Sequence, residues 1–233
     1  MQAPQHEPEW FREVSGLTTH STGPAGAAAL YLACVGGGGP VNLVLVGHTN
    51  CEMAAPVELV SPSATFCDSY RSLVDEFVER SENLVPFVLA FQHTDFDEFL
   101  AQLAECSRGR GLAVGFVPHS TYWLIRDNRD VVGVSNIRHS LTPALRREGG
   151  NIGYGIRPSC RGRGFGVEIL RRSLCEAKSF GLSSVLLTCG KANIASAKTI
   201  IRNGGVLESE EYLSERGEVV QRYVIGVVSH GLA

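Results

Sequence analysis

The hydrophobic pattern of the second half of the chain predicts a strand, a tight turn and a helix in succession. Tyr154 and Ile156 lie in an extended run, and Pro158 ends it because proline has no backbone donor for a sheet. A helix follows, with apolar residues three or four positions apart on one face and charged residues on the other. These apolar residues are Val167, Leu170, Leu174 and Ala177, and Gly181 suits the helix end.

The same reasoning predicts regular elements on both sides of this unit. Downstream are a buried-type strand at 184–189, a helix over 194–203 capped by Asn193 and ended by Gly204-Gly205, and a hairpin of 206–213 with 219–227. Upstream are a strand at 57–60, a helix with the apolar stripe Phe66, Tyr70, Leu73, Val74, Phe77 and Val78, a second helix capped by Thr94, and a hairpin of 120–126 with 131–139 around the turn 127–130.

The turn between the central strand and its helix has the chemistry of an anion site. Gly162, Gly164 and Gly166 stand at alternate positions, where backbone N–H groups approach a ligand without a Cβ in the way. The positive end of the helix dipole faces the same turn, and Arg161 and Arg163 add charge beside it. This arrangement predicts a bound pyrophosphate, with an ordinary strand-to-helix turn as the alternative.

Two familiar phosphate loops do not match this turn. A dinucleotide-binding fingerprint needs the spacing Gly-x-Gly-x-x-Gly and an acidic residue after the next strand, whereas the spacing here is Gly-x-Gly-x-Gly. A P-loop needs Lys followed by Ser or Thr after its last glycine, and this glycine is followed by Val167 and Glu168.

The turn instead resembles the acyl-CoA signature of the GNAT superfamily of N-acetyltransferases, [Arg/Gln]-x-x-Gly-x-[Gly/Ala], through Arg161, Gly164 and Gly166. The elements predicted after it follow the order of that superfamily, and the resemblance covers about 56–228. It is closest to uncharacterised bacterial-type members that carry Gly-Phe-Val-Pro-His-Ser-Thr-Tyr-Trp, found here at 115–123. The resemblance implies an α/β (α+β) GNAT acyltransferase fold, with a mixed, mostly antiparallel central sheet of six to seven strands flanked by about four helices.

The resemblance also implies where acetyl-CoA, the acyl-donor cosubstrate, is held. The backbone N–H near Ile156 would polarise the thioester carbonyl, and Asn193 would contact the pantetheine arm. Ser196 either bonds the cosubstrate or caps its own helix. The pyrophosphate would be held by the signature residue Arg161 and the N–H groups of Gly162, Arg163, Gly164, Phe165 and Gly166.

The proton-transfer residues depart from the pattern of the superfamily. Many members have a Tyr seven residues after the Asn, where this chain has Ile200, and a Glu before Ile-Gly-Tyr, where it has Asn151. The nearby substitutes as catalytic base are His139 and Glu148, with His119 as a third titratable neighbour, and His139 has the most suitable ordinary pKa. Either residue is alternatively a solvated surface group.

Two further expectations concern the acceptor and Cys189. In the superfamily the first two helices wall the acceptor pocket, so Phe87, Phe91, Asp95 and Asp97 are in range of an amine, with core packing as the alternative for the aromatic side chains. Cys189 ends a buried apolar strand, which favours an inert thiol over a covalent acetyl-cysteine route.

Composition places these elements in one globular domain. A chain of 233 residues with 44% hydrophobic residues can bury a large core, and a net charge of −3 argues against a nucleic-acid partner. The seven cysteines show no metal-ligand spacing, so we expect reduced thiols and no metal site. We predict an N-terminal extension at 1–55, the acetyltransferase domain at 56–228 and a tail at 229–233.

The pattern of the N-terminal extension does not decide between several structures. Its first residues include acidic side chains where a signal peptide would be basic, so we do not expect a signal peptide. Residues 25–47 are apolar enough to suggest a membrane-spanning helix, but four glycines and Pro40 argue against one. A flexible segment or two short strands are the other interpretations.

The sequence therefore predicts a cytoplasmic enzyme that moves an acetyl group from acetyl-CoA to a primary amine by direct attack in a ternary complex. The acceptor would be a small molecule or a peptide, with no membrane partner, and a homodimer is possible. The alternative function is a non-catalytic acyl-CoA-binding sensor, suggested by Asn151 and Ile200.

Overall fold

The structure, a computed structural model, describes residues 56–227, which lie within one compact unit, His48–Ala233. The predicted extension at 1–55, including the apolar segment 25–47, and the predicted tail at 229–233 lie outside the described residues. Between residues 56 and 227, no helix has the length and apolar character needed to cross a membrane.

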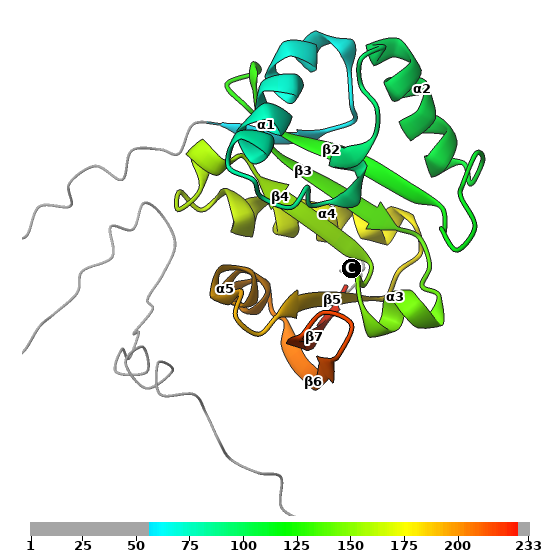
Figure 1. Ribbon diagram of the computed structural model, residues 1–233, viewed down its shortest axis with the longest axis vertical. Helices are drawn as coiled ribbons and strands as arrows, with labels where there is room; N and C mark the ends of the chain where they lie inside the picture. The colour runs from blue at the N-terminus through cyan, green and yellow to red at the C-terminus, as the bar shows by residue number, and fades with distance from the viewer. Residues whose placement is uncertain (1–55, 228–233) are drawn as a thin grey trace, which may run out of the picture. The chain divides into compact units, whose positions relative to one another are not determined.

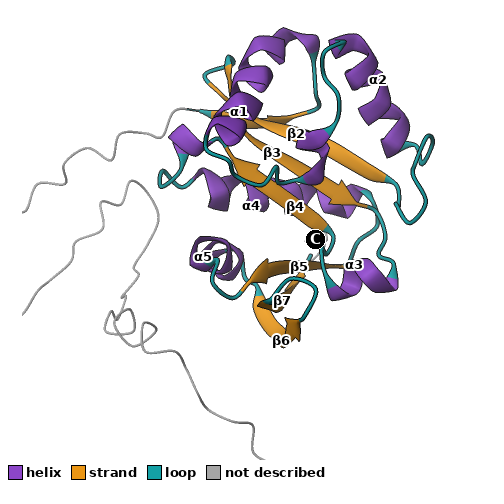
Figure 2. Ribbon diagram, in the orientation of Figure 1, coloured by secondary structure: helices purple, strands orange, loops and turns teal. Residues whose placement is uncertain are grey.

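Seven strands in the described part form two antiparallel sheets (Figures 1 and 2). The predicted fold class is confirmed, but the strands are divided between two sheets that meet at one junction. The first sheet has the order β1-β2-β3-β4 and contains β1 (Val57–Val60), β2 (His119–Arg126), β3 (Asp130–Arg138) and β4 (Ile152–Ile156). The second has the order β5-β7-β6 and contains β5 (Ser184–Gly190), β6 (Val206–Leu213) and β7 (Glu218–Gly226).

Five α-helices accompany these strands within the described residues. Figure 1 shows α1 and α2 on one face of the first sheet and α4 on the other. The helices are α1 (Cys67–Glu79), α2 (Phe96–Ser107), α3 (Pro143–Arg147), α4 (Phe165–Ser179) and α5 (Ile194–Arg202). Short 3-10 turns lie at Ala64–Phe66, Phe87–Ala90 and Pro158–Cys160.

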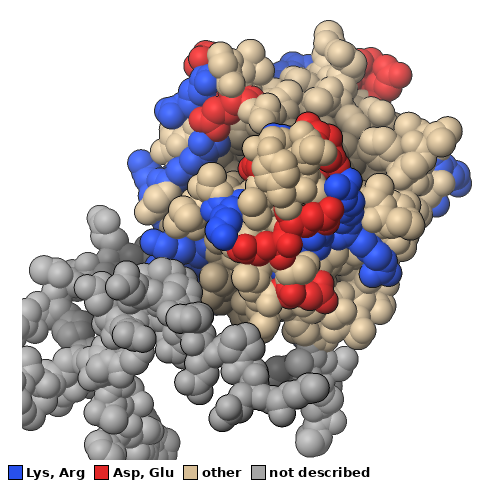
Figure 3. Space-filling model, turned by 60° about the horizontal axis from the view of Figure 1, so that its bottom comes forward, with Lys and Arg blue, Asp and Glu red and all other residues tan. Residues whose placement is uncertain are grey.

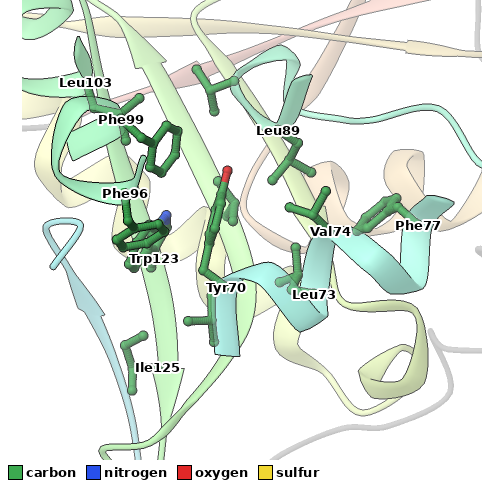
Figure 4. Close-up of a cluster of buried hydrophobic side chains, with 13 residues drawn as sticks. Tyr70, Leu73, Val74, Phe77, Leu89, Phe96, Phe99, Leu103, Trp123 and Ile125 are labelled. Atoms are coloured by element: carbon green, nitrogen blue, oxygen red, sulfur yellow. The ribbon is translucent and has the colours of Figure 1, made fainter. Parts of the chain in front are cut away.

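An aromatic cluster joins α1 and α2 to the first sheet (Figure 4). Tyr70 of α1 stacks on Trp123 of β2, with ring centroids 4.7 Å apart and planes 22° from parallel. Because side chains alternate along a strand, Trp123 and Ile125 face this cluster while Leu124 packs with Ile169 of α4 on the opposite face. One strand thus supports the helices on both faces of the sheet.

The turns and caps follow the sequence predictions with small shifts. Asp127 and Asn128 have φ of 54° and 53°, as a tight hairpin turn requires, and Gly181 has φ of 76° just after α4. The predicted cap of α2 at Thr94 is wrong by one residue, because the side-chain oxygen of Asp95 accepts the Glu98 N–H at 3.0 Å.

Charged side chains of both signs are interspersed on the surface (Figure 3). Arg147, for example, pairs with Glu211 and with Glu215 of the second sheet's hairpin. Exposed pairs of this kind contribute at most about 1 kcal/mol each, so the fold depends mainly on its buried clusters.

Candidate active site at the junction of the two sheets

The two sheets are fastened together at the start of β4. The Asn151 N–H donates to the Leu186 carbonyl of β5 at 2.7 Å, and the Leu186 N–H donates to the Asn151 side-chain oxygen at 2.9 Å. Gly150 precedes this contact with φ of 63°, and a Cβ there would lie 2.3 Å from the Leu186 oxygen. Asn151, where many relatives carry a catalytic Glu, is therefore a buried structural residue in this chain.

Beyond this junction, one backbone edge of β4 has no partner strand among the described residues. The Asn151 carbonyl accepts from β3 at one end of the strand, and the Arg157 N–H donates to the Val132 carbonyl of β3 at 2.9 Å at the other. In an antiparallel ladder, alternate residues bond to the same neighbour, so the residues between these positions that have the opposite parity face away from β3. They are Ile152, Tyr154 and Ile156.

A cavity of about 330 Å³ lies between β4, β5 and the start of α5. The loop Leu84–Phe87 forms another wall, and it lies against β4 because of two glycines. A Cβ on Gly155 would meet the Val85 carbonyl oxygen at 1.9 Å, and one on Gly153 would touch Pro86 at 3.4 Å.

The glycine-rich turn before α4 fits the phosphate of an acyl-CoA. Gly162 and Gly164 have φ of 76° and 83°, and the space where their Cβ atoms would stand is open. Within residues 56–227, the N–H groups of 162–166 have no hydrogen-bond partner, and α4 begins at Phe165 without a side-chain cap. Free N–H groups at a helix N-terminus are suited to a phosphate.

The two arginines of this turn have different surroundings. Arg161 pairs with Glu82 at 2.6 Å, donates to the Ile156 carbonyl at 3.2 Å and lies over the Phe77 ring. Its charge is thus largely compensated, and the side chain ties the turn to the end of α1. Arg163 is exposed, and the structure gives it no ion pair among the described residues.

Asn193 and Ser196 border the cavity at the start of α5. The Asn193 side chain caps the helix by accepting the Ser196 N–H at 3.0 Å, as predicted. The Ser196 hydroxyl lies 3.2 Å from the Tyr154 hydroxyl of β4, so it bridges the two elements. Contact of Asn193 and Ser196 with the cosubstrate stays a prediction.

Tyr154 also borders the cavity and was not predicted as a functional residue. Burial raises the pKa of its phenol to about 12, so the hydroxyl remains protonated at neutral pH and can donate a hydrogen bond. Its sequence signal is the glycine on each side, which leaves this tyrosine as the only large side chain of that stretch of strand.

Cys189 of β5 lines the same cavity but is only 8% exposed. Burial raises the pKa of its thiol to about 11, which keeps it protonated and poorly nucleophilic. The inert interpretation of this cysteine is therefore the better supported.

The two predicted bases are in different places. Glu148 borders the cavity and pairs with Arg216, which borders it too. His139 does not border it: its ring stacks on Phe180 at 4.0 Å between centroids, and its Nε2 lies 3.0 Å from the Ser120 hydroxyl.

The expected acceptor lining is only partly brought together. Phe87 borders the cavity, while Phe91 packs against the core beside α1 and α2. Asp95 caps α2 and Asp97 is exposed in its first turn, so the expectation of an acidic lining from these two residues is wrong. Both lie at the N-terminal end of α2 instead, where a negative charge interacts favourably with the helix dipole.

Comparison with known proteins agrees with this geometry. The family described as acetyltransferase (GNAT) domain matches residues 75–206, more than half of the chain, so the chain belongs to the GNAT acetyltransferases, whose acyl donor is acetyl-CoA. A search of curated proteins finds no match.

Solved structures show the same fold. A microcin C7 self-immunity acetyltransferase, MccE, in complex with acetyl-CoA and AMP is 15% identical, with a TM-score of 0.53 over 73% of this chain and 92% of that one. An acetyltransferase from Salmonella typhimurium that modifies the N-terminal serine of ribosomal protein L7/L12 is 18% identical, with a TM-score of 0.52 over 73% and 94%. A dodecameric spermidine N-acetyltransferase from Vibrio cholerae is 14% identical, with a TM-score of 0.50 over 73% and 94%.

Proposed function

We propose that this protein is an N-acetyltransferase that moves an acetyl group from acetyl-CoA to a primary amine by direct attack in a ternary complex. The observation that carries the proposal is the position of the cavity: it lies beside the free edge of β4, which leads into the unpartnered N–H groups before α4. A chain of this family thus retains both a place for the thioester and a place for the phosphates. The amine acceptors named for the neighbouring structures support an amine here as well.

The donor supplies an activated acyl group: the amine nitrogen attacks its carbonyl carbon, the C–S bond breaks, and the sulfur leaves as a thiolate. The outward-facing N–H of Ile156 is suited to stabilise charge on the carbonyl oxygen as it develops. The N–H groups of 162–166 and the free charge of Arg163 are suited to the pyrophosphate, while Arg161 keeps the turn in place.

Proton transfer needs one base and one hydrogen-bond donor. We assign the base to Glu148, because it borders the cavity and remains partly exposed, so it can act directly or through a water. His139, stacked on Phe180, has no access to the cavity and is not assigned. Tyr154 is assigned as the donor to the leaving sulfur, in place of the tyrosine that Ile200 replaces.

The second candidate is an acyl-CoA sensor without turnover. Asn151 and Ile200 favour it, because the amide of Asn151 and the alkyl side chain of Ile200 cannot serve as base or acid, and both are buried. The thiols of the described cysteines are free, which fits a reducing cytoplasm for either function.

Two measurements separate these functions. Calorimetric titration with acetyl-CoA, using NADH and ATP as comparison ligands, tests the cosubstrate, and saturable binding of acetyl-CoA alone is expected. CoA release is then followed with a panel of primary amines. An enzyme releases CoA in proportion to added amine, whereas a sensor binds acetyl-CoA and releases none with any acceptor.

A further inference from the structure

A second cavity, of about 240 Å³, adjoins the first and shares two of its wall residues, Phe87 and Arg138. Its other walls come from the segment before β2 and from α3, and they are mainly apolar. They include Phe116, Val117, His119 and Leu145. A molecule that spans the two cavities would pass Arg138.

Arg138 carries a positive charge that no described acidic side chain neutralises. Its guanidinium donates to the carbonyls of Gly149 and Gly150 at 3.2 and 3.0 Å and lies 5.2 Å from the centre of the Phe87 ring. Among residues 56–227 it forms no ion pair, and burial lowers its pKa. Glu148, the carboxylate that borders the first cavity, is already paired with Arg216. A half-buried charge without a counter-ion loses part of its hydration at a cost in free energy, so this position is suited to an anion that arrives with a ligand.

His119 adds an unsatisfied hydrogen-bond donor to the same wall. It is 1% exposed, and the Asn136 amide donates to its Nδ1 at 2.9 Å, which places the ring proton on Nε2. Within the described residues, Nε2 has no hydrogen-bond partner. An unpaired buried donor costs about 1–3 kcal/mol, which an acceptor oxygen would recover.

We propose that the amine substrate carries a carboxylate, held by Arg138 and His119. The substrate would then be a free amino acid with an apolar side chain. This inference rests on the proposed acetyltransferase function. The planar guanidinium matches a carboxylate, and Phe87, Phe116 and Leu145 supply an apolar wall for the side chain. A polyamine would instead bring further positive charge to the unpaired Arg138, so polyamines are expected to be poor acceptors.

The test compares three acceptors that are matched except for the anionic group, together with one polyamine. CoA release is measured with an apolar amino acid such as L-phenylalanine, with its carboxamide, with a phosphonate analogue and with spermidine. The carboxylate should be preferred over the carboxamide by about tenfold or more in kcat/KM, as the net gain of a charge-assisted pair implies. Equal or better turnover of the carboxamide or spermidine would overturn the proposal, and preference for the phosphonate would replace the carboxylate with a phosphate-like group.

Arg138→Gln tests the residue itself. It should lower kcat/KM for the carboxylate acceptor by roughly ten- to a hundredfold and leave the carboxamide nearly unchanged, which abolishes the discrimination. A purely structural role, through the Gly149 and Gly150 carbonyls, would reduce both acceptors equally. Arg222→Gln is the control, because Arg222 likewise donates to a backbone carbonyl but is paired with Glu211 and borders neither cavity.

Two additional measurements keep the test decisive. If Arg138→Gln does not fold, His119→Gln should still narrow the preference for the carboxylate, and an unchanged preference would contradict the proposal. If no amine is turned over, the proposed function fails, and calorimetric titration of the amino acid and its carboxamide in the presence of CoA tests the carboxylate site by itself. Tighter binding of the amino acid supports the site, and equal or absent binding overturns it.

Discussion

Asn151 and Leu186 form a reciprocal pair of hydrogen bonds that joins the two sheets, with N···O distances of 2.7 and 2.9 Å. From this point β4 and β5 belong to different sheets, and the cavity lies where they have separated. The position at which the resemblance led us to expect a catalytic Glu thus sets the geometry of the cleft in this chain.

Asn151→Ala is expected to destabilise the protein by about 1–3 kcal/mol, because the Leu186 N–H loses its partner in a partly buried place. Asn151→Glu, which introduces the residue common in relatives, should also destabilise it rather than raise activity. Urea unfolding of the three proteins measures the effect. Wild-type stability in either variant would show that the side chain does not fasten the sheets.

Gly164→Glu is expected to weaken acetyl-CoA binding by at least about tenfold, since it places a negative charge against the pyrophosphate. Gly181→Glu is the matched control: it has a similar positive φ and open surroundings, but lies beyond the opposite end of α4. Both variants carry the same backbone strain, so calorimetry isolates the effect of position. Equal affinity of the two variants would remove the phosphate assignment.

Tyr154→Phe is expected to lower kcat by roughly ten- to a hundredfold while leaving the affinity for acetyl-CoA nearly unchanged, because only the hydroxyl is lost. Tyr212→Phe, at an exposed tyrosine of β6, serves as the control and should be silent. A rate for Tyr154→Phe that matches the control would show that the Tyr154 hydroxyl does not stabilise the leaving thiolate.

The free energy of unfolding should decrease as the pH is lowered from 6.5 towards 4, the unfolded and folded pKa values of His119. Burial, with repulsion from Arg138 and His139, lowers its pKa to about 4 from an unfolded value of 6.5. Between these values the unfolded chain binds the extra proton, so this histidine alone should cost about 2 kcal/mol between pH 7 and pH 5. Urea unfolding at both pH values tests this, and His119→Gln should flatten the dependence. An equal pH dependence in the variant would assign it to other groups.

The elements of the fold were predictable because each leaves a local pattern. Tyr70, Leu73, Val74 and Phe77 of the predicted stripe are buried in α1, whereas Val78 is exposed and Phe66 lies in the turn before the helix. Asn193 and Gly181 mark helix ends as predicted. The glycine-rich turn was likewise predictable from the sequence, since its positive φ values and free N–H groups follow from the residue types.

The division of the sheet and the character of the acceptor side were not predictable in this way. Which backbone groups of β4 stay unpaired depends on Asn151 and Leu186, which are 35 positions apart along the chain. The partial burial of Arg138 depends on the approach of Phe87, and a lone arginine at a strand end gives no sign of that. Gly153 and Gly155 were the one overlooked signal, because glycines inside a strand indicate a close neighbour.

The most direct test of the account is mass spectrometry of an amine panel incubated with the protein and acetyl-CoA labelled in the acetyl group. The label is expected on an acceptor nitrogen, in amounts equal to the CoA released, and is not expected to accumulate on Cys189. Tight binding of acetyl-CoA with no label on any amine would contradict the enzymatic function and leave the sensor as the better description.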